Sequence, residues 1–196
     1  MCQIQAMSDT DLLALMVGPK TAQEMLKKSS GSISALLNES VAAYDPKPKV
    51  QCRLYAAKEL VRRSLHEALR QRSCLSSPAA VRDFLRITLE GREHEVFVVV
   101  FLDAQNRVIA TEEMFRGTLT QTSVYPREVV KETLARNSAA VVLVHNHPSG
   151  TAHPSRADEA LTQTLKAALA LVDVRVLDHL IVAGPYILSM AEKGLM

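Results

Sequence analysis

The chain has 196 residues, of which 47% are apolar and 22% are charged, and its net charge is +2, the composition of a globular protein of one or two domains. It has no apolar run near the ~20 residues of a membrane span and no charged start followed by an apolar segment, so we expect a cytoplasmic protein without membrane contact. Its three cysteines are widely spaced, which argues against a disulfide framework and a thiolate zinc site.

The first part of the chain predicts a small bundle of helices. Ser8 and Asp11 form a Ser-x-x-Asp pattern that caps a helix, and Gly18-Pro19 ends that helix. The prolines within residues 45–49 cannot lie inside a helix, so they interrupt the series. We expect a first helix through residues 12–16, capped by residues 8–11, and further helices over residues 21–28, 33–37 and 50–72.

Positive charge is concentrated in the first half of the chain. Residues 1–92 carry 14 Lys and Arg against 9 Asp and Glu, whereas residues 93–196 carry 9 against 12. The first half is therefore the candidate for contact with a polyanion, and a solvated helix face is the alternative. Weak, sequence-independent and salt-sensitive DNA contacts would come from Arg53, Arg62, Arg63, Arg70 and Arg72.

Residues 73–78 are rich in serine and predict a linker, so we expect two domains, 1–73 and 74–196. Beyond the linker, helical and strand patterns alternate. We expect a helix over residues 78–89, strands over 96–102 and 107–110, a helix over 127–137, a strand over 139–144, a helix over 155–171 and a strand over 174–182. This order predicts an α/β fold in which a mixed β-sheet is sandwiched by helices.

Two histidines end the buried strand predicted at residues 139–144. Alternate side chains of a strand share a face, so His145 and His147 point to one side and Asn146 to the other. The pattern from Ser155 to Asp158 opens the next helix and returns a carboxylate in its first turn. Two imidazoles, one carboxylate and an open fourth position are typical of a catalytic zinc. The alternatives are an ordinary surface pair of histidines and a plain helix cap.

The spacing His-x-His-x7-Ser-x-x-Asp, formed by His145, His147, Ser155 and Asp158, resembles the JAMM motif of the JAB/MPN+ metallopeptidase-like domains. The stretch HNHPSG, with TQTSVYPREVV before it and VLDHLIVAG after it, resembles the RadC branch of that family. The likeness covers residues 74–196 and implies an MPN/JAB domain with a layered fold like that of cytidine deaminases.

The resemblance also implies an activity and a set of roles. It implies a metallopeptidase that holds one Zn²⁺ per chain on His145, His147 and Asp158 and hydrolyses a peptide or isopeptide bond in a peptide or protein substrate. Glu95, which directly precedes the strand at residues 96–102, corresponds to the family's general base, and Glu93 is the other candidate. Ser155 is expected to stabilise the oxyanion as well as to cap its helix.

RadC-like proteins carry a helix-hairpin-helix-like region with a Gly-x-Gly turn before this domain. Here Asp45 and Lys47 stand where the glycines would be, so the region is degenerate and the close approach of backbone to phosphate that glycine permits is lost.

Other zinc hydrolases fit the sequence less well. The His-x-Glu and Pro-Cys-x-x-Cys motifs of nucleobase deaminases are absent, as is the His-Glu-x-x-His of thermolysin-like enzymes. The remaining alternative is a metal-binding, DNA-associated module without peptidase activity. Two imidazoles and a carboxylate also accept iron or manganese.

Overall fold

The computed structural model of the chain describes residues 4–38, 47–71, 78–89, 91–118 and 123–196. The chain divides into two compact units, Met1–Arg63 and Ser64–Met196. Asp45 and residues 72–77, where the linker is predicted, lie outside the described residues. The predicted domain boundary between residues 73 and 74 therefore stays a prediction.

The first unit is helical, as predicted. It contains η1 (Ile4–Ala6), α1 (Asp9–Val17), α2 (Pro19–Lys28), α3 (Ile33–Asn38) and the first part of α4 (Pro48–Gln71). Ser8 caps α1 by accepting a hydrogen bond from the Asp11 amide at 3.2 Å. Leu13, Met25 and Leu54 belong to the small apolar core of this unit.

The second unit contains a five-stranded mixed sheet. Its strands are β1 (Val96–Leu102), β2 (Val108–Arg116), β3 (Ala140–Asn146), β4 (Arg175–Ala183) and β5 (Tyr186–Ser189). Their order in the sheet is β2-β1-β3-β4-β5, and β3 and β4 pair in parallel while the other neighbours are antiparallel. β2 extends well beyond the predicted residue 110, and β5 was not predicted.

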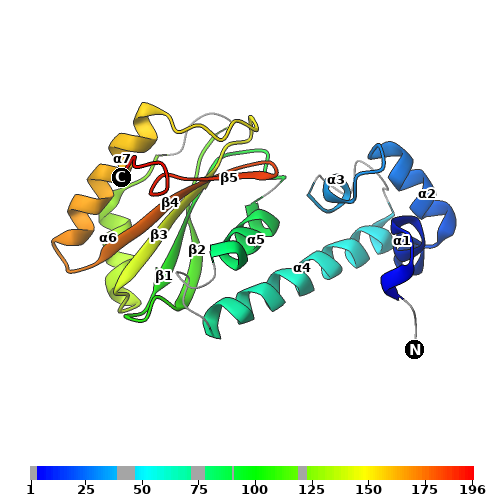
Figure 1. Cartoon of the computed structure of the whole chain (residues 1–196), viewed down its shortest axis with the longest axis horizontal. Helices are drawn as coiled ribbons and strands as arrows, with labels where there is room; N and C mark the ends of the chain where they lie inside the picture. The colour runs from blue at the N-terminus through cyan, green and yellow to red at the C-terminus, as the bar shows by residue number, and fades with distance from the viewer. Residues whose placement is uncertain (1–3, 39–46, 72–77, 90, 119–122) are drawn as a thin grey trace. The chain divides into compact units, whose positions relative to one another are not determined.

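Helices cover both faces of this sheet. Figure 1 shows α5 (Pro78–Leu89) on one face, with α6 (Pro126–Ala135) and α7 (Arg156–Ala170) on the other. All residues of β1 are buried, and they alternate: Phe97 and Phe101 pack toward α6 and α7, whereas Val98 and Val100 pack toward α5. The predicted α/β fold, a mixed sheet sandwiched by helices, is confirmed. None of the helices in the described part of the chain is long and apolar enough to cross a membrane.

The parallel pairing of β3 and β4 fixes the position of α7. Parallel neighbours need a crossover connection, and α7 supplies it. The chain leaves the carboxyl end of β3, passes through residues 147–155 and enters α7 on the α6 side of the sheet. Open α/β sheets place their ligand sites beyond strand ends of this kind.

Candidate metal centre

The end of β3 presents two imidazoles on one face. His145 continues the alternation of Val141 and Leu143, so it points toward α7, while Asn146 points to the opposite face. The His147 amide donates to the Val182 carbonyl at 2.8 Å, which keeps the chain paired with β4 one residue beyond the strand. A turn then closes with the Gly150 amide donating to the His147 carbonyl at 3.1 Å, and Gly150 has φ +77°, a conformation that favours glycine.

The amino-terminal end of α7 supplies the carboxylate. The Ser155 hydroxyl accepts a hydrogen bond from the Asp158 amide at 3.2 Å, and the Asp158 carboxylate accepts one from the Ser155 amide at 2.7 Å. This reciprocal capping box fixes the side chain of Asp158 in the first turn. The Ser155 hydroxyl also donates to Asp158 Oδ2 at 2.7 Å; Oδ2 faces His147 as well, and Oδ1 faces His145.

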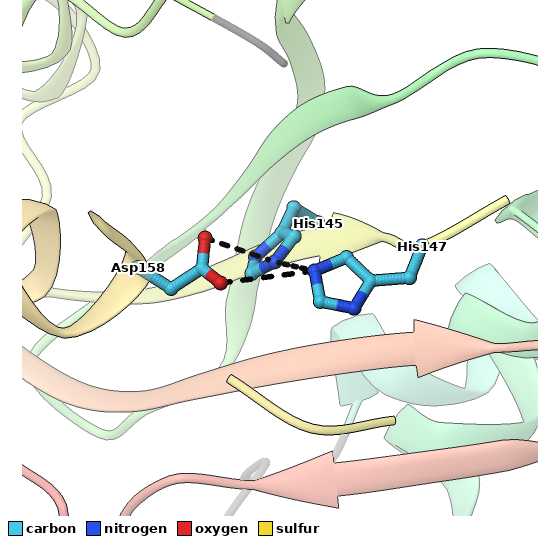
Figure 2. A group of neighbouring side chains, drawn as sticks. All are labelled: His145, His147 and Asp158. Atoms are coloured by element: carbon cyan, nitrogen blue, oxygen red, sulfur yellow. Dashed lines mark hydrogen bonds and ion pairs between the residues drawn. The ribbon is translucent and has the colours of Figure 1, made fainter. Parts of the chain in front are cut away.

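His145, His147 and Asp158 converge on one point, as Figure 2 shows. The distance between the two Nε2 atoms is 2.9 Å, from His145 Nε2 to Asp158 Oδ1 it is 3.3 Å, and from His147 Nε2 to Asp158 Oδ2 it is 3.7 Å. Zinc bonds of 2.0–2.2 Å place the ligand atoms of a tetrahedral site about 3.3 Å apart. The three residues therefore fit a metal ion, and among the described residues the group includes no fourth protein ligand.

Burial and charge favour the metal-binding forms of His145 and Asp158. Burial lowers the pKa of His145 to about 4, so its imidazole is neutral at neutral pH. The hydrogen bond with Asp158 raises the pKa of His147. Burial alone would raise the pKa of Asp158, but the bonds from His147 and Ser155 and the nearby His145 hold that pKa well below its usual range. A neutral His145 and an ionised Asp158 are the forms that bind metal.

Each histidine has a hydrogen-bond partner on the side away from the site. His147 Nδ1 lies 2.8 Å from the Thr151 carbonyl, which can only accept, so this nitrogen carries the proton and Nε2 faces the site. His145 Nδ1 lies 2.8 Å from Nε2 of His179, a buried histidine on β4. Ligand histidines in metalloproteins are oriented by partners of this kind.

Glu95 directly precedes β1, the strand that pairs with β3 next to His145. It is half-buried, whereas Glu93 is exposed. Its backbone is held in place because its amide donates to the Thr118 carbonyl at 2.9 Å and its carbonyl accepts from Gly117 at 2.8 Å. The charge of Glu95 contributes to the raised pKa of His147, so the two side chains lie within electrostatic reach.

Three residues that the sequence reasoning did not assign to the site also belong to its surroundings. Asn146 donates to the His94 carbonyl at 3.1 Å and accepts from the Val96 amide at 2.8 Å, so its side chain bridges both sides of Glu95. His179 contacts His145, and Thr162 of α7 contacts His179. The only signal for Asn146 was its place between two histidines on the opposite face of the strand.

Comparisons with known proteins agree with this architecture. Residues 75–195 match the RadC-like JAB domain family. A UPF0758 protein of Polaromonas sp. is 54% identical over 97% of this chain and 90% of that protein. A UPF0758 protein of Nitrosospira multiformis is 52% identical over 97% of this chain and 90% of that protein. A UPF0758 protein of Verminephrobacter eiseniae is 57% identical over 85% of this chain and 72% of that protein. The names of these relatives state no reaction or ligand.

Proposed function

This chain belongs to the RadC-like JAB domain family, and on that premise we propose that it is a JAMM-type zinc metallopeptidase that hydrolyses a peptide or isopeptide bond. The observation that carries the proposal is the convergence of His145, His147 and Asp158, whose ligand atoms lie within 4.8 Å of one another. Three protein ligands leave a fourth tetrahedral position, which a catalytic zinc needs and a structural zinc lacks.

The metal and the residues around the site have separate roles in amide hydrolysis. Zinc, when bound, supplies Lewis acidity that lowers the pKa of water toward 7 and polarises the substrate carbonyl. The Glu95 carboxylate accepts the proton that the attacking water loses and then donates it to the leaving nitrogen. Two features support Glu95 in this role, its place directly before β1 and its electrostatic contact with His147.

Ser155 has a proposed second role beside capping α7. Its hydroxyl donates to Asp158 Oδ2 at 2.7 Å, and we propose that this donor turns toward the oxyanion that forms on the substrate carbonyl. Its amide, 2.7 Å from the same carboxylate, would continue to hold Asp158 during that exchange.

The proposal is tested by separating metal binding from turnover. Purified protein is expected to contain about one zinc per chain, and His147→Ala to lose it, as measured by elemental analysis. Glu95→Gln should keep the zinc and lower turnover by about 10²–10⁴-fold, the usual contribution of a general acid and base. Turnover is measured on a proteome-derived peptide library by mass spectrometry of the cleavage products.

Glu93→Gln is the matched control, since it removes an exposed carboxylate two residues away and should leave turnover unchanged. Full activity in Glu95→Gln would overturn the assignment of the base. A zinc-loaded wild-type protein that yields no cleavage products would favour a metal-binding module without peptidase activity.

A further inference from the structure

His145, His179 and Thr162 form a chain of three buried polar side chains. His145 Nδ1 is 2.8 Å from His179 Nε2, and His179 Nδ1 is 2.6 Å from the Thr162 hydroxyl. His179 and Thr162 have no exposed surface. The rings of Phe97 and His179 pack in a T-shaped arrangement with their centroids 5.7 Å apart. Buried polar groups are costly unless each one is hydrogen-bonded, and here both nitrogens of His179 and the Thr162 hydroxyl have partners.

The fold brings these residues together from three elements. His179 stands beside Leu143 in the parallel register of β3 and β4, next to the strand that carries His145. Thr162 lies one turn of α7 beyond Asp158, and its hydroxyl reaches the Asp158 carbonyl at 2.6 Å. The chain of contacts therefore begins at one candidate ligand, His145, and ends at the backbone of another, Asp158.

The proton positions in this chain follow from its last contact. A carbonyl only accepts, so the single hydroxyl proton of Thr162 is donated to Asp158; the Met190 sulfur, 3.8 Å from the same oxygen, is a weaker acceptor. The Thr162 oxygen then accepts from His179 Nδ1, and a neutral His179 has its lone pair on Nε2. That lone pair accepts from His145 Nδ1, which leaves the lone pair of His145 on Nε2.

We propose that His179 and Thr162 are positioning residues that hold His145 in its Nδ1–H tautomer, with the Nε2 lone pair directed at His147 and Asp158. In the opposite arrangement Thr162 would donate to His179, His179 to His145, and the proton on His145 Nε2 would block a metal bond. The inference rests on the proposed metal site. It adds that a residue of α7, Thr162, determines the tautomer of the candidate ligand His145 through His179.

The test uses an isosteric pair at position 162. Thr162→Val removes the acceptor of the His179 Nδ1 proton, so His179 should carry its proton on Nε2 and donate it to His145. Thr162→Ser keeps the hydroxyl and serves as the control. Nitrogen-15 NMR of the imidazoles in metal-free protein reports the tautomer, and competition with a chelator reports the affinity for zinc.

We expect His145 as the Nδ1–H tautomer in the wild type and in Thr162→Ser, and as the Nε2–H tautomer in Thr162→Val. Zinc affinity should fall by about 10- to 100-fold in Thr162→Val, the usual effect of losing a partner of a ligand histidine. His179→Leu, which removes the acceptor of His145 directly, should lower zinc affinity to a similar extent and covers the case in which Thr162→Val does not fold.

An Nε2–H tautomer of His145 in the metal-free wild type would overturn the inference, as would wild-type zinc affinity in either Thr162→Val or His179→Leu. Failure of the proposed function gives different results. If the metal site itself fails, the wild type binds no zinc, while the tautomers of the wild type and the two Thr162 variants still follow the expected pattern. If only the peptidase activity fails, both the tautomers and the zinc affinities follow the expected pattern.

Discussion

Asn146 is the residue whose role differs most from that of its neighbours in the sequence. It stands between two candidate ligands yet points to the α5 side of the sheet, where it is 4% exposed. Its amide contacts the peptide groups on both sides of Glu95, through the His94 carbonyl and the Val96 amide. One residue thereby couples the strand end that holds the metal ligands to the segment that holds the proposed base.

Asn146→Leu should therefore weaken catalysis without removing the metal. The variant leaves the Val96 amide buried without this acceptor, which costs about 1–3 kcal/mol of the free energy of unfolding, and it removes the bonds that hold the peptide groups on both sides of Glu95. We expect zinc content near that of the wild type and lower turnover per bound zinc. Denaturant unfolding, elemental analysis and peptide cleavage measure the three quantities.

Val144→Ala is the control for this prediction, because Val144 is buried on the same face of β3 and makes an apolar contact only. It should lower stability and leave turnover per zinc unchanged. If Asn146→Leu behaves like Val144→Ala, Asn146 is structural and does not position Glu95.

The sequence was sufficient to group His145, His147 and Asp158, because strand alternation and helix capping are local rules. It was not sufficient for the residues behind them. Asn146 bonds across 50 residues to Val96, and His145 bonds across 34 residues to His179. Such partners depend on the order and register of the strands, which no local pattern specifies.

At the scale of elements, the amino-terminal end of α7 combines a helix cap with a ligand. A plain cap is also present in the chain, since Ser8 accepts from the Asp11 amide at 3.2 Å and donates to the Asp11 carboxylate at 2.6 Å in front of α1. The two caps share these residue types and these two bonds, and the α7 cap adds a bond from the Ser155 amide to the Asp158 carboxylate at 2.7 Å. The α7 cap also differs in its place beyond the end of β3, beside two histidines.

Comparison of Ser155→Ala with Ser8→Ala separates the capping role from the proposed catalytic role. Each variant loses the side chain of an N-cap, so each should cost about 0.5–2 kcal/mol of helix stability. Only Ser155→Ala should lower turnover, by about 10²–10³-fold, the typical effect of losing one oxyanion donor. Equal turnover per bound zinc in the two variants would show that Ser155 caps α7 and has no catalytic role.

The sequence predicted the bounds of most helices and strands to within a few residues. It did not predict the full length of β2 or the existence of β5. β2 continues to Arg116, although its later residues are partly buried or exposed, because pairing with β1 extends it. β5 is only four residues long, and its pairing with β4 through Ser189 and Leu180 is what makes it a strand. Both depend on a neighbouring strand more than on their own residues.

At the scale of the whole molecule, the excess of positive charge in residues 1–92 raises the question of DNA contact. Two of the arginines that could make it are already engaged. Arg62 donates to both oxygens of Glu59, at 2.7 and 2.8 Å, and Arg63 donates to the same carboxylate at 2.8 Å. These bonds lower the pKa of Glu59 to about 2, so at neutral pH it is ionised and offsets part of their charge.

We therefore propose that any DNA contact of the wild type is weak, and we predict that Glu59→Gln strengthens it by removing the carboxylate that engages Arg62 and Arg63. Anisotropy of a labelled duplex should show low affinity for the wild type at about 50 mM salt and loss of binding at about 200 mM, with a steeper salt dependence for the variant. Glu24→Gln adds the same unit of charge by removing an exposed carboxylate on α2 and should change affinity less. No binding by the wild type or by Glu59→Gln at low salt would end the DNA hypothesis and leave the charge of these residues as that of a solvated helix.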